Sequence, residues 1–455
     1  MNRPPVDQFS RSLAEETRAS VRNASVLKTA SRLPTLHVAY DDVDAARQTA
    51  AEIKDYTLDH LAELLETFEQ QAQKSGIQVH WANDAAEAVE QILEICKGVA
   101  PDGCTIVKAK SMATEEIHLN DHLQQAGFEP VETDLGEYVV QIDHDAPSHI
   151  VTPIIHKNRR QVAASFTREG LGPYTESPED LAAQARAHLR SQFQKARVGI
   201  SGVNFAVAET GRLVIVENEG NNRYSTTAPP VHIAVMGLEK IIPREKDLGL
   251  FIRLLVGSST GQRITSYVHF VSGPRRADEP DGPDQVHLIL LDNGRSKAIA
   301  GPYRSILRCI RCGACQNACP VYRQASGHAY GHVYSGPIGA VLAPALEGVE
   351  RLGQMAKASS LCGECEEVCP VRIPIPRMLL QIRDEAQRAS GSPDAAWIAY
   401  ALAATHPREW RTGISVLPIL GASPVSNPMK SGWFEFRELP KRRGRPFRRW
   451  WHDRH

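Results

Sequence analysis

Seven of the nine cysteines lie in two short runs, and these runs constrain the chain more than any other feature. The first, Cys309 to Pro320, reads C-x2-C-x2-C-x3-C-P, and the second, Cys362 to Pro370, reads C-x2-C-x3-C-P. Thiolates at this spacing, closed by a proline, are typical of iron-sulfur ligation in bacterial two-cluster proteins. The sequence therefore predicts a module that folds around two iron-sulfur clusters.

A crossing rule assigns the cysteines, because the last cysteine of each run ligates the cluster held by the other run. Cluster 1 is then predicted to take Cys309, Cys312, Cys315 and Cys369, and cluster 2 to take Cys319, Cys362 and Cys365. Ser359 stands where a complete pattern would place the missing cysteine. Cluster 2 is predicted to be a three-iron cluster, or a four-iron cluster whose last iron takes an oxygen ligand from Ser359, from water or from a neighbouring residue.

Two other interpretations of the cysteines fit less well. Structural zinc sites take four ligands from paired CxxC units and do not need the x3-C-P ending. Disulfides belong to oxidising compartments, whereas the first residues of this chain lack an apolar signal core. No apolar run approaches the ~20 residues of a membrane helix, so we expect a cytoplasmic protein.

Charge is balanced overall but uneven along the chain. The formal net charge is -1, which gives no general field for nucleic acid or acidic substrates. The basic tail, residues 441–455, interleaves cationic and aromatic side chains, a composition that can bind nucleic acid, anionic lipid or an acidic protein. A disordered or partner-docked tail is the simpler interpretation, and nucleic acid is not the expected partner.

Upstream of the cysteine runs, short apolar segments alternate with segments of helical periodicity. Candidate strands are Ile77–Trp81, Thr105–Lys108, Val131–Thr133, His149–Thr152, Leu213–Glu217, His232–Gly237 and Val286–Leu291. Strands that alternate with helices predict an α/β domain with a mostly parallel sheet covered on both faces. We therefore expect a helical extension over 1–50, the α/β domain over 51–298, an α-helical, ferredoxin-like two-cluster module over 299–385, and a C-terminal region with the basic tail over 386–455.

Ligands of such sheets bind outside the carboxyl ends of the strands, so the loops there are candidate sites. The loop Lys108–Ser111 offers two amines at a helix N-terminus, where an anion could bind. The loop Glu209–Gly211 offers a carboxylate among glycines. The plainer interpretations are a surface lysine pair and a polar hairpin turn. Lys108, Lys110 and Glu209 are the candidate catalytic residues of this domain.

Four features, in this order, resemble the lactate-utilisation iron-sulfur proteins (LutB type). They are Lys108–Met112, Ala208–Gly211, Glu217–Arg223 and the two cysteine runs. The resemblance implies that the α/β domain is a LUD domain, with a sheet related to the sugar-phosphate isomerases. It also implies a cytoplasmic three-protein system that oxidises L-lactate to pyruvate for use as carbon source. Its other members would be a cysteine-rich protein and a smaller LUD protein. A family pattern of seven cluster cysteines also argues against Ser359 as a damaged ligand.

The chemistry of lactate oxidation fits a role of this chain as an electron relay. Lactate oxidation releases two electrons, and the chain shows no flavin or nicotinamide fingerprint, so the substrate step is expected on partner chains. The expected function is therefore an iron-sulfur electron-transfer subunit. Three alternatives stay open: a LUD domain that itself binds and oxidises a hydroxy acid with Lys108, Lys110 and Glu209, a subunit of another quinone-linked dehydrogenase, and a redox sensor that acts through the basic tail.

Overall fold

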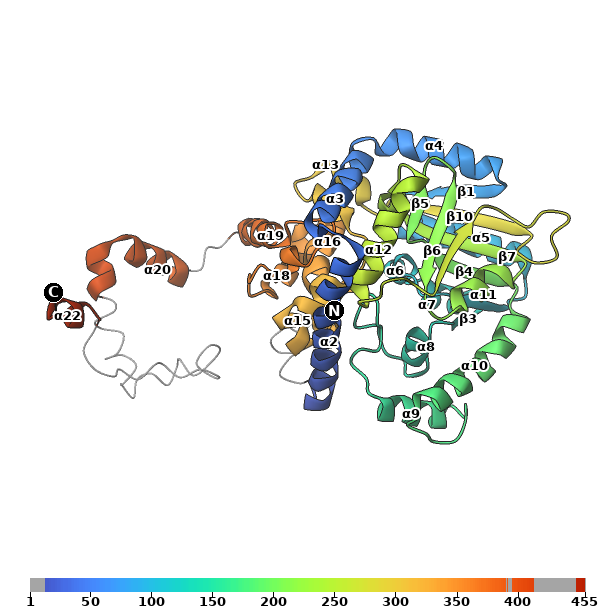
Figure 1. Cartoon of the computed structure of the whole chain (residues 1–455), viewed down its shortest axis with the longest axis horizontal. Helices are drawn as coiled ribbons and strands as arrows, with labels where there is room; N and C mark the ends of the chain where they lie inside the picture. The colour runs from blue at the N-terminus through green and yellow to red at the C-terminus, as the bar shows by residue number, and fades with distance from the viewer. Residues whose placement is uncertain (1–12, 390, 392–394, 413–446, 455) are drawn as a thin grey trace. The chain divides into compact units, whose positions relative to one another are not determined.

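The computed structural model describes residues 13–389, 391, 395–412 and 447–454 (Figure 1). The chain divides into two compact units, Met1–Ala386 and Gln387–His455. The second unit contains α20 (Ala395–Thr405) and α22 (Phe447–His452), so part of the basic tail is helical and residues 441–446 and 455 lie outside the described part. No helix in the described residues combines the length and the apolar character that crossing a membrane requires.

A six-stranded parallel sheet forms the centre of the first unit, in the order β1-β10-β7-β4-β2-β3. Its strands are β1 (Ile77–Ala82), β2 (Thr105–Lys108), β3 (Glu129–Glu132), β4 (Val198–Gly202), β7 (Val231–Gly237) and β10 (Gln285–Leu291). Every residue of β7 is buried, as expected of a central strand with both faces covered. The predicted α/β fold with a mostly parallel sheet is confirmed.

The helices that follow or cover these strands complete the α/β domain. They are α5 (Ala85–Val99), α6 (Met112–Glu116), α7 (Leu119–Gln125), α8 (Leu135–Ile142), α9 (Arg159–Arg168), α10 (Pro178–Lys195), α11 (Asn221–Thr227) and α12 (Leu248–Ser259), with short 3-10 turns η1 (Leu238–Lys240) and η2 (Glu245–Asp247). The chain runs from β2 outward to β3 and then returns past β2 to β4. The direction of winding therefore reverses between β2 and β4, the position at which such sheets form a ligand crevice outside the carboxyl ends of the strands.

Two strand predictions need correction, and one central strand was not predicted. Leu213–Glu217 is a strand but belongs to a second sheet, β8-β5-β6-β9, built from β5 (Phe205–Val207), β6 (Arg212–Glu217), β8 (Ile241–Ile242) and β9 (Tyr267–Val271). His149–Thr152 is a loop, because the His149 ring accepts the backbone N–H groups of Val151 and Thr152 that a strand would need. The segment Gly199–Gly202 was not among the candidate strands, but it is part of the central strand β4, where a Cβ at Gly199 would lie 1.7 Å from Ser225 O.

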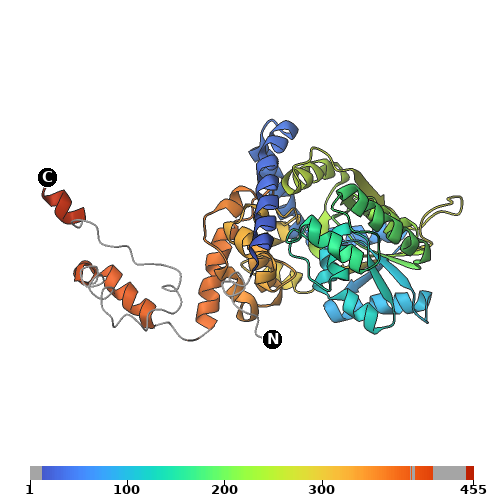
Figure 2. The ribbon, with the colours of Figure 1, turned by 90° about the horizontal axis from the view of Figure 1, so that it is seen from below.

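Three long helices precede the sheet: α2 (Glu15–Ala39), α3 (Val43–Asp59) and α4 (Leu61–Lys74). Residue 50 lies inside α3, so the N-terminal extension continues into the α/β domain without a break. Helix α2 contacts α12 on one side and α14 and α15 of the cysteine module on the other, and Figure 2 shows it at the border between them. Its buried Val21 and Leu36 belong to the core that both parts share.

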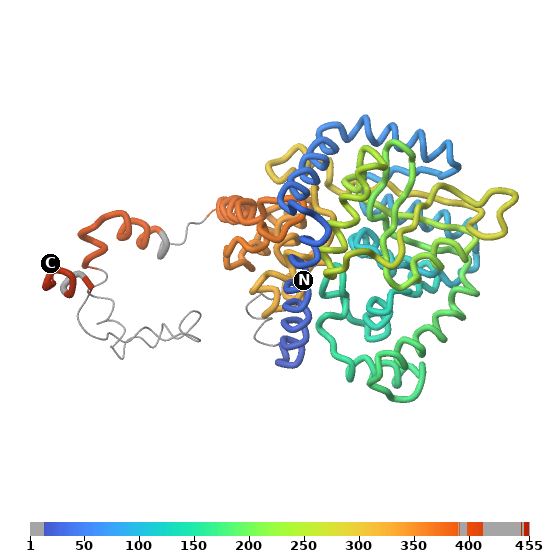
Figure 3. The backbone as a smooth tube through the Cα atoms, viewed as in Figure 1, coloured from blue at the N-terminus to red at the C-terminus, as the bar shows by residue number. Residues whose placement is uncertain are grey.

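The cysteine module is helical and packs directly on the α/β domain within the first unit (Figure 3). It consists of α13 (Arg295–Ala300), η3 (Arg304–Arg308), α14 (Ala314–Ala318), α15 (Pro320–Ala325), η4 (His328–Tyr330), α16 (Gly336–Glu347), α17 (Val349–Leu352), η5 (Gly353–Lys357), α18 (Glu364–Glu367) and α19 (Ile375–Ala389). Helix α16 is almost entirely buried, which explains its apolar sequence. It separates the two cysteine runs along the chain.

Candidate metal centre

Four of the cysteines line one cavity. Cys309, Cys312 and Cys315 of the first run meet Cys369 of the second, and isoleucines close the walls: Ile150, Ile310, Ile338, Ile373 and Ile375. Pro370, after the last cysteine, also lines this cavity, and Cys369 O accepts a hydrogen bond of 2.9 Å from Arg47 Nε. The set is the one predicted for cluster 1.

The thiols of this cavity fit a metal cluster rather than a set of free side chains. Burial, together with the neighbouring cysteines, raises the pKa of Cys312 to about 12 and that of Cys369 to about 11. Metal ligation requires thiolates, and a bound cation supplies the charge that makes thiolates stable in an apolar site. Four sulfurs in an apolar cavity are the donor set that an iron-sulfur cluster takes.

The backbone of the first run is shaped around this cavity. Arg311 adopts a positive φ of 61°, and its backbone N–H donates to Cys309 Sγ at 3.3 Å. Gly313 follows at the N-cap of α14 with φ 74°, and a Cβ there would lie 2.8 Å from His149 Cε1. Only glycine takes this positive φ easily and fits here without moving the His149 ring.

The three other cysteines of the two runs form a second group. Cys319 and Cys365 are buried and Cys362 is exposed. Burial raises the pKa of Cys365 to about 12, and the charges of Cys319 and Cys362 add to the rise, which shows that the three sulfurs are neighbours. Ser359 Oγ accepts the backbone N–H of Leu361 at 3.1 Å. Ser359 Oγ, the expected oxygen ligand, therefore has one lone pair left for iron, and the hydrogen bond from the backbone already fixes its position.

A buried charge network that the sequence did not indicate connects the sheet to the cluster 1 loop. Glu239, just after β7, accepts from Arg311 at 3.0 Å and from Arg295 at 2.6 Å, and Arg295 also binds Glu116 at 2.9 Å. Burial opposes the charge of Arg311, but Cys309, Tyr334 and Glu239 together raise its pKa. A fixed cation beside Cys309 stabilises negative charge on the sulfurs.

Lys108, the first candidate of the α/β domain, has a structural environment. It is 1% exposed, and its ammonium contacts Glu132 Oε1 at 2.7 Å, Glu115 Oε1 at 3.0 Å and Thr114 Oγ1 at 3.0 Å. Burial disfavours the charge, but the two carboxylates outweigh it and raise the pKa of Lys108. Three partners use its three protons, so this lysine has none left for a ligand.

Lys110 is in a different situation, although it lies only two residues away. Its nearest carboxylate is Glu137 Oε1 at 3.7 Å, and its buried Nζ has no hydrogen-bond partner among the described residues. Lys28 of α2 lies near it: burial and the Lys110 charge lower the pKa of Lys28 to about 8. In the loop after β6, burial and Asp134 raise the pKa of Glu219 to about 7. The crevice position between β2 and β4 therefore holds an amine that has no hydrogen-bond partner within the described part of the chain.

Glu209 lies apart from these groups. It sits in the turn that joins β5 to β6, where its carboxylate accepts the backbone N–H of Glu245 at 2.9 Å. The turn also needs Gly211, because a Cβ there would lie 2.3 Å from the backbone nitrogen of Ala72. The structure therefore brings Lys108 and Lys110 to one strand end and places Glu209 in the second sheet.

His149 joins the crevice to the cluster 1 loop. Its Nδ1 accepts the N–H groups of Val151 and Thr152, each at 3.0 Å, so Nε2 carries the proton and donates to Asn317 Oδ1 at 3.1 Å. Asn317 lies on α14, between Cys315 and Cys319. Burial and the charges of Lys28 and Lys110 hold the pKa of His149 well below its usual range. A neutral, fully bonded His149 fixes the position of the cluster loop.

Comparison with known families agrees with this architecture. The LUD domain profile matches residues 65–291, the 4Fe-4S dicluster domain profile matches 305–373, and the profile of the lactate utilisation protein B C-terminal region matches 371–455. The fold and the cysteine site therefore define a LUD-domain protein with an iron-sulfur dicluster module. The predicted LUD domain and the predicted 4Fe-4S cofactor class are confirmed.

Individual relatives narrow the assignment. "Lactate utilization protein B" of Shouchella clausii is 42% identical and the match covers 90% of this chain and 88% of the relative. The Bacillus licheniformis protein of the same name is 43% identical, with coverage of 90% and 88%. "Uncharacterized electron transport protein YkgF" of Escherichia coli is 42% identical, with coverage of 89% and 87%. The chain belongs to the lactate utilization protein B family.

A solved structure of a DUF162 family protein from Deinococcus radiodurans is a distant likeness. It shares 14% identity and a TM-score of 0.29, and the match covers 51% of this chain and 98% of that one. The strand order and the burial of this chain define its fold without reference to that structure.

Proposed function

We propose that this chain is the iron-sulfur electron-transfer subunit of a cytoplasmic complex that oxidises L-lactate to pyruvate. The observation that carries the proposal is the cavity where three cysteines of the first run meet Cys369 of the second. The names of the relatives supply the substrate. Two clusters, when bound, would pass single electrons between a substrate site and an acceptor.

The residues of this chain would hold the two clusters unequally. Cys309, Cys312, Cys315 and Cys369 would hold a four-iron cluster in the apolar cavity. Cys319, Cys362 and Cys365 would hold a second cluster whose fourth ligand is Ser359, water or absent, as in a three-iron cluster. Because Cys362 is exposed, the second site is the one that an electron acceptor can approach.

The partners are part of the proposal. The sequence carries no flavin or nicotinamide fingerprint, so a cysteine-rich protein and a smaller LUD protein of the same system would complete the reaction. Purification under anaerobic conditions, with analysis of iron and sulfide and EPR spectroscopy, tests the clusters. Growth on L-lactate of a deletion strain, complemented by wild type but not by Cys312→Ser, tests the function. A preparation with stoichiometric zinc and no iron would contradict the proposal.

A second candidate function is a hydroxy-acid site in this chain itself, and Lys110 favours it. A carboxylate at the carboxyl end of β2 would satisfy the buried amine that has no hydrogen-bond partner among the described residues, and Lys28 would add a second positive charge. His149 joins this crevice to the cluster 1 loop. Isothermal titration of L-lactate into the isolated holoprotein separates the two candidates, because a pure relay gives no binding heat.

A further inference from the structure

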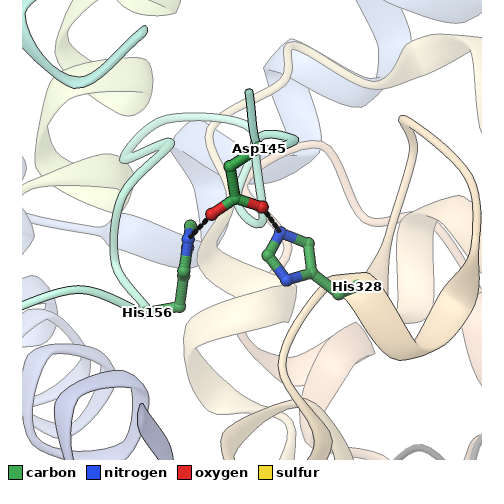
Figure 4. A group of neighbouring side chains, drawn as sticks. All are labelled: Asp145, His156 and His328. Atoms are coloured by element: carbon green, nitrogen blue, oxygen red, sulfur yellow. Dashed lines mark hydrogen bonds and ion pairs between the residues drawn. The ribbon is translucent and has the colours of Figure 1, made fainter. Parts of the chain in front are cut away.

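Three side chains outside both cysteine groups converge at the border between the α/β domain and the cysteine module. Asp145 and His156 lie in the loop between α8 and α9, and His328 begins η4, shortly after α15 and Cys319. Their ligand atoms all lie within 4.8 Å of one another (Figure 4). His156 Nε2 is 2.9 Å from Asp145 Oδ2, and His328 Nε2 is 3.8 Å from Asp145 Oδ1.

The hydrogen bonds around His156 allow a tautomer that can bind a metal ion. Its Nδ1 lies 2.7 Å from Ser148 Oγ, and the same hydroxyl lies 3.2 Å from Pro153 O. The hydroxyl can therefore either donate to His156 Nδ1, or donate to Pro153 O and accept from His156 Nδ1. In the first arrangement His156 Nε2 donates its proton to Asp145 Oδ2 at 2.9 Å, and in the second Nε2 presents a lone pair. A metal ion at this point would take the place of that proton and select the second arrangement.

The ammonium nearest to Asp145 pairs with its Oδ2. Lys157 Nζ lies 3.1 Å from Asp145 Oδ2 and 2.6 Å from Asp143 Oδ2, and Arg168 pairs with Asp143 at 2.6 Å. Asp145 Oδ1 accepts the backbone N–H of Ala146 at 2.8 Å and faces His328. Ala146 O accepts a hydrogen bond from His328 Nε2 at 2.6 Å, so a metal ion here would replace the Nε2 proton of this ring too, with the carbonyl as a further oxygen at this point.

We propose that Asp145, His156 and His328 bind a divalent first-row transition-metal ion at the border of the two domains. Two imidazoles and one carboxylate are a donor set that Zn2+ and Fe2+ take, with positions left for water or a carbonyl oxygen. Ser148 orients His156 in the way that outer hydrogen bonds orient metal-bound histidines. The ion would tie the α8–α9 loop to the segment that follows Cys319.

Zinc binding to the holoprotein tests this site. The full chain with both clusters intact is freed of loosely bound metal, loaded with Zn2+ and desalted, and zinc, iron and sulfide are measured together. We expect one zinc per chain beyond the cluster iron. Asp145→Asn and His328→Ala should lose it, whereas His144→Asn, which removes an exposed imidazole beside Asp145, should keep it.

Two further measurements keep the test decisive. X-ray absorption at the zinc edge should show nitrogen and oxygen ligands at about 2.0–2.1 Å, whereas sulfur at about 2.3 Å would place the zinc on cluster cysteines and overturn the proposal. If His328→Ala loses its clusters, Ser148→Ala replaces it and should weaken zinc binding about 10- to 100-fold. Equal zinc binding by wild type and Ser148→Ala, or no zinc in the loaded wild type beyond that of a chelated sample, would also overturn it.

Discussion

Replacement of Lys108 by methionine tests whether this lysine has a structural role or binds a ligand. The ammonium is 1% exposed and pairs with Glu132, whose side chain is 3% exposed, and with Glu115, which is 21% exposed. Glu115 can regain water after the change, but Glu132 cannot, so the loss falls on Glu132. Removing one partner of a buried pair costs about 3–5 kcal/mol.

Protonation of Glu132 limits the loss of stability in this variant. An unpaired Glu132 can take up a proton at pH 7, which costs about 3.7 kcal/mol for a carboxyl with an ordinary pKa of about 4.3. We therefore expect Lys108→Met to lose about 3–4 kcal/mol of local stability at pH 7. The folded variant then binds one proton more than the unfolded chain, so its stability falls by about 1.4 kcal/mol for each unit that the pH rises. The defect should be smaller at pH 6 and larger at pH 8.

Amide hydrogen exchange on the holoprotein measures this without global unfolding. The β2 and β3 amides, residues 105–108 and 129–132, should lose protection by a factor of roughly 100 to 1,000 at pH 7, since 1.4 kcal/mol is tenfold. Lys108→Met combined with Glu132→Gln should recover most of the protection, because it removes the unpaired charge. A loss below tenfold, or one that does not change with pH, would refute the structural role of Lys108.

Three further predictions concern the clusters and the crevice. Gly313→Ala, with a Cβ 2.8 Å from His149, should deplete cluster 1 iron. Gly363→Ala is the control: it is also at a positive φ but has no described atom within 4 Å, so it should lower the stability by only about 1–2 kcal/mol. Equal iron loss in both variants would contradict this. Ser359→Cys should supply the missing thiolate and slow the loss of iron in air, and an unchanged rate would argue against Ser359 as the vacant ligand position. Lys110→Met should remove any lactate binding heat while the β2 amides stay protected; binding that persists would exclude the crevice.

The cysteine module was predictable because its chemistry is local in sequence. The spacing of Cys309, Cys312 and Cys315 and the proline after Cys369 carry the cluster pattern without reference to the rest of the chain. Strand β4 was missed because its glycines, required by the close approach of Ser225 O to Gly199, remove the apolar signal of a central strand.

The contacts between the domains were not predictable. Glu239 pairs with Arg311, and His149 with Asn317, across long sequence separations, and no spacing rule connects them. Lys108 and Lys110 read alike in sequence, and only their burial and partners assign the first to the core and the second to the crevice. Glu209 was grouped with the two lysines because glycines lie near it in the sequence. In the structure Gly211 belongs to a hairpin turn instead.

The most direct test of an electron-transfer role is the redox state of the clusters during turnover. The chain, reconstituted with the proposed cysteine-rich and LUD partners, is mixed with L-lactate and freeze-quenched for EPR while pyruvate is measured in parallel. We predict that the clusters are reduced before pyruvate accumulates to more than one equivalent, and that Cys312→Ser abolishes steady pyruvate formation. Pyruvate formed at the wild-type rate while the clusters stay oxidised, or by the Cys312→Ser complex, would contradict the account.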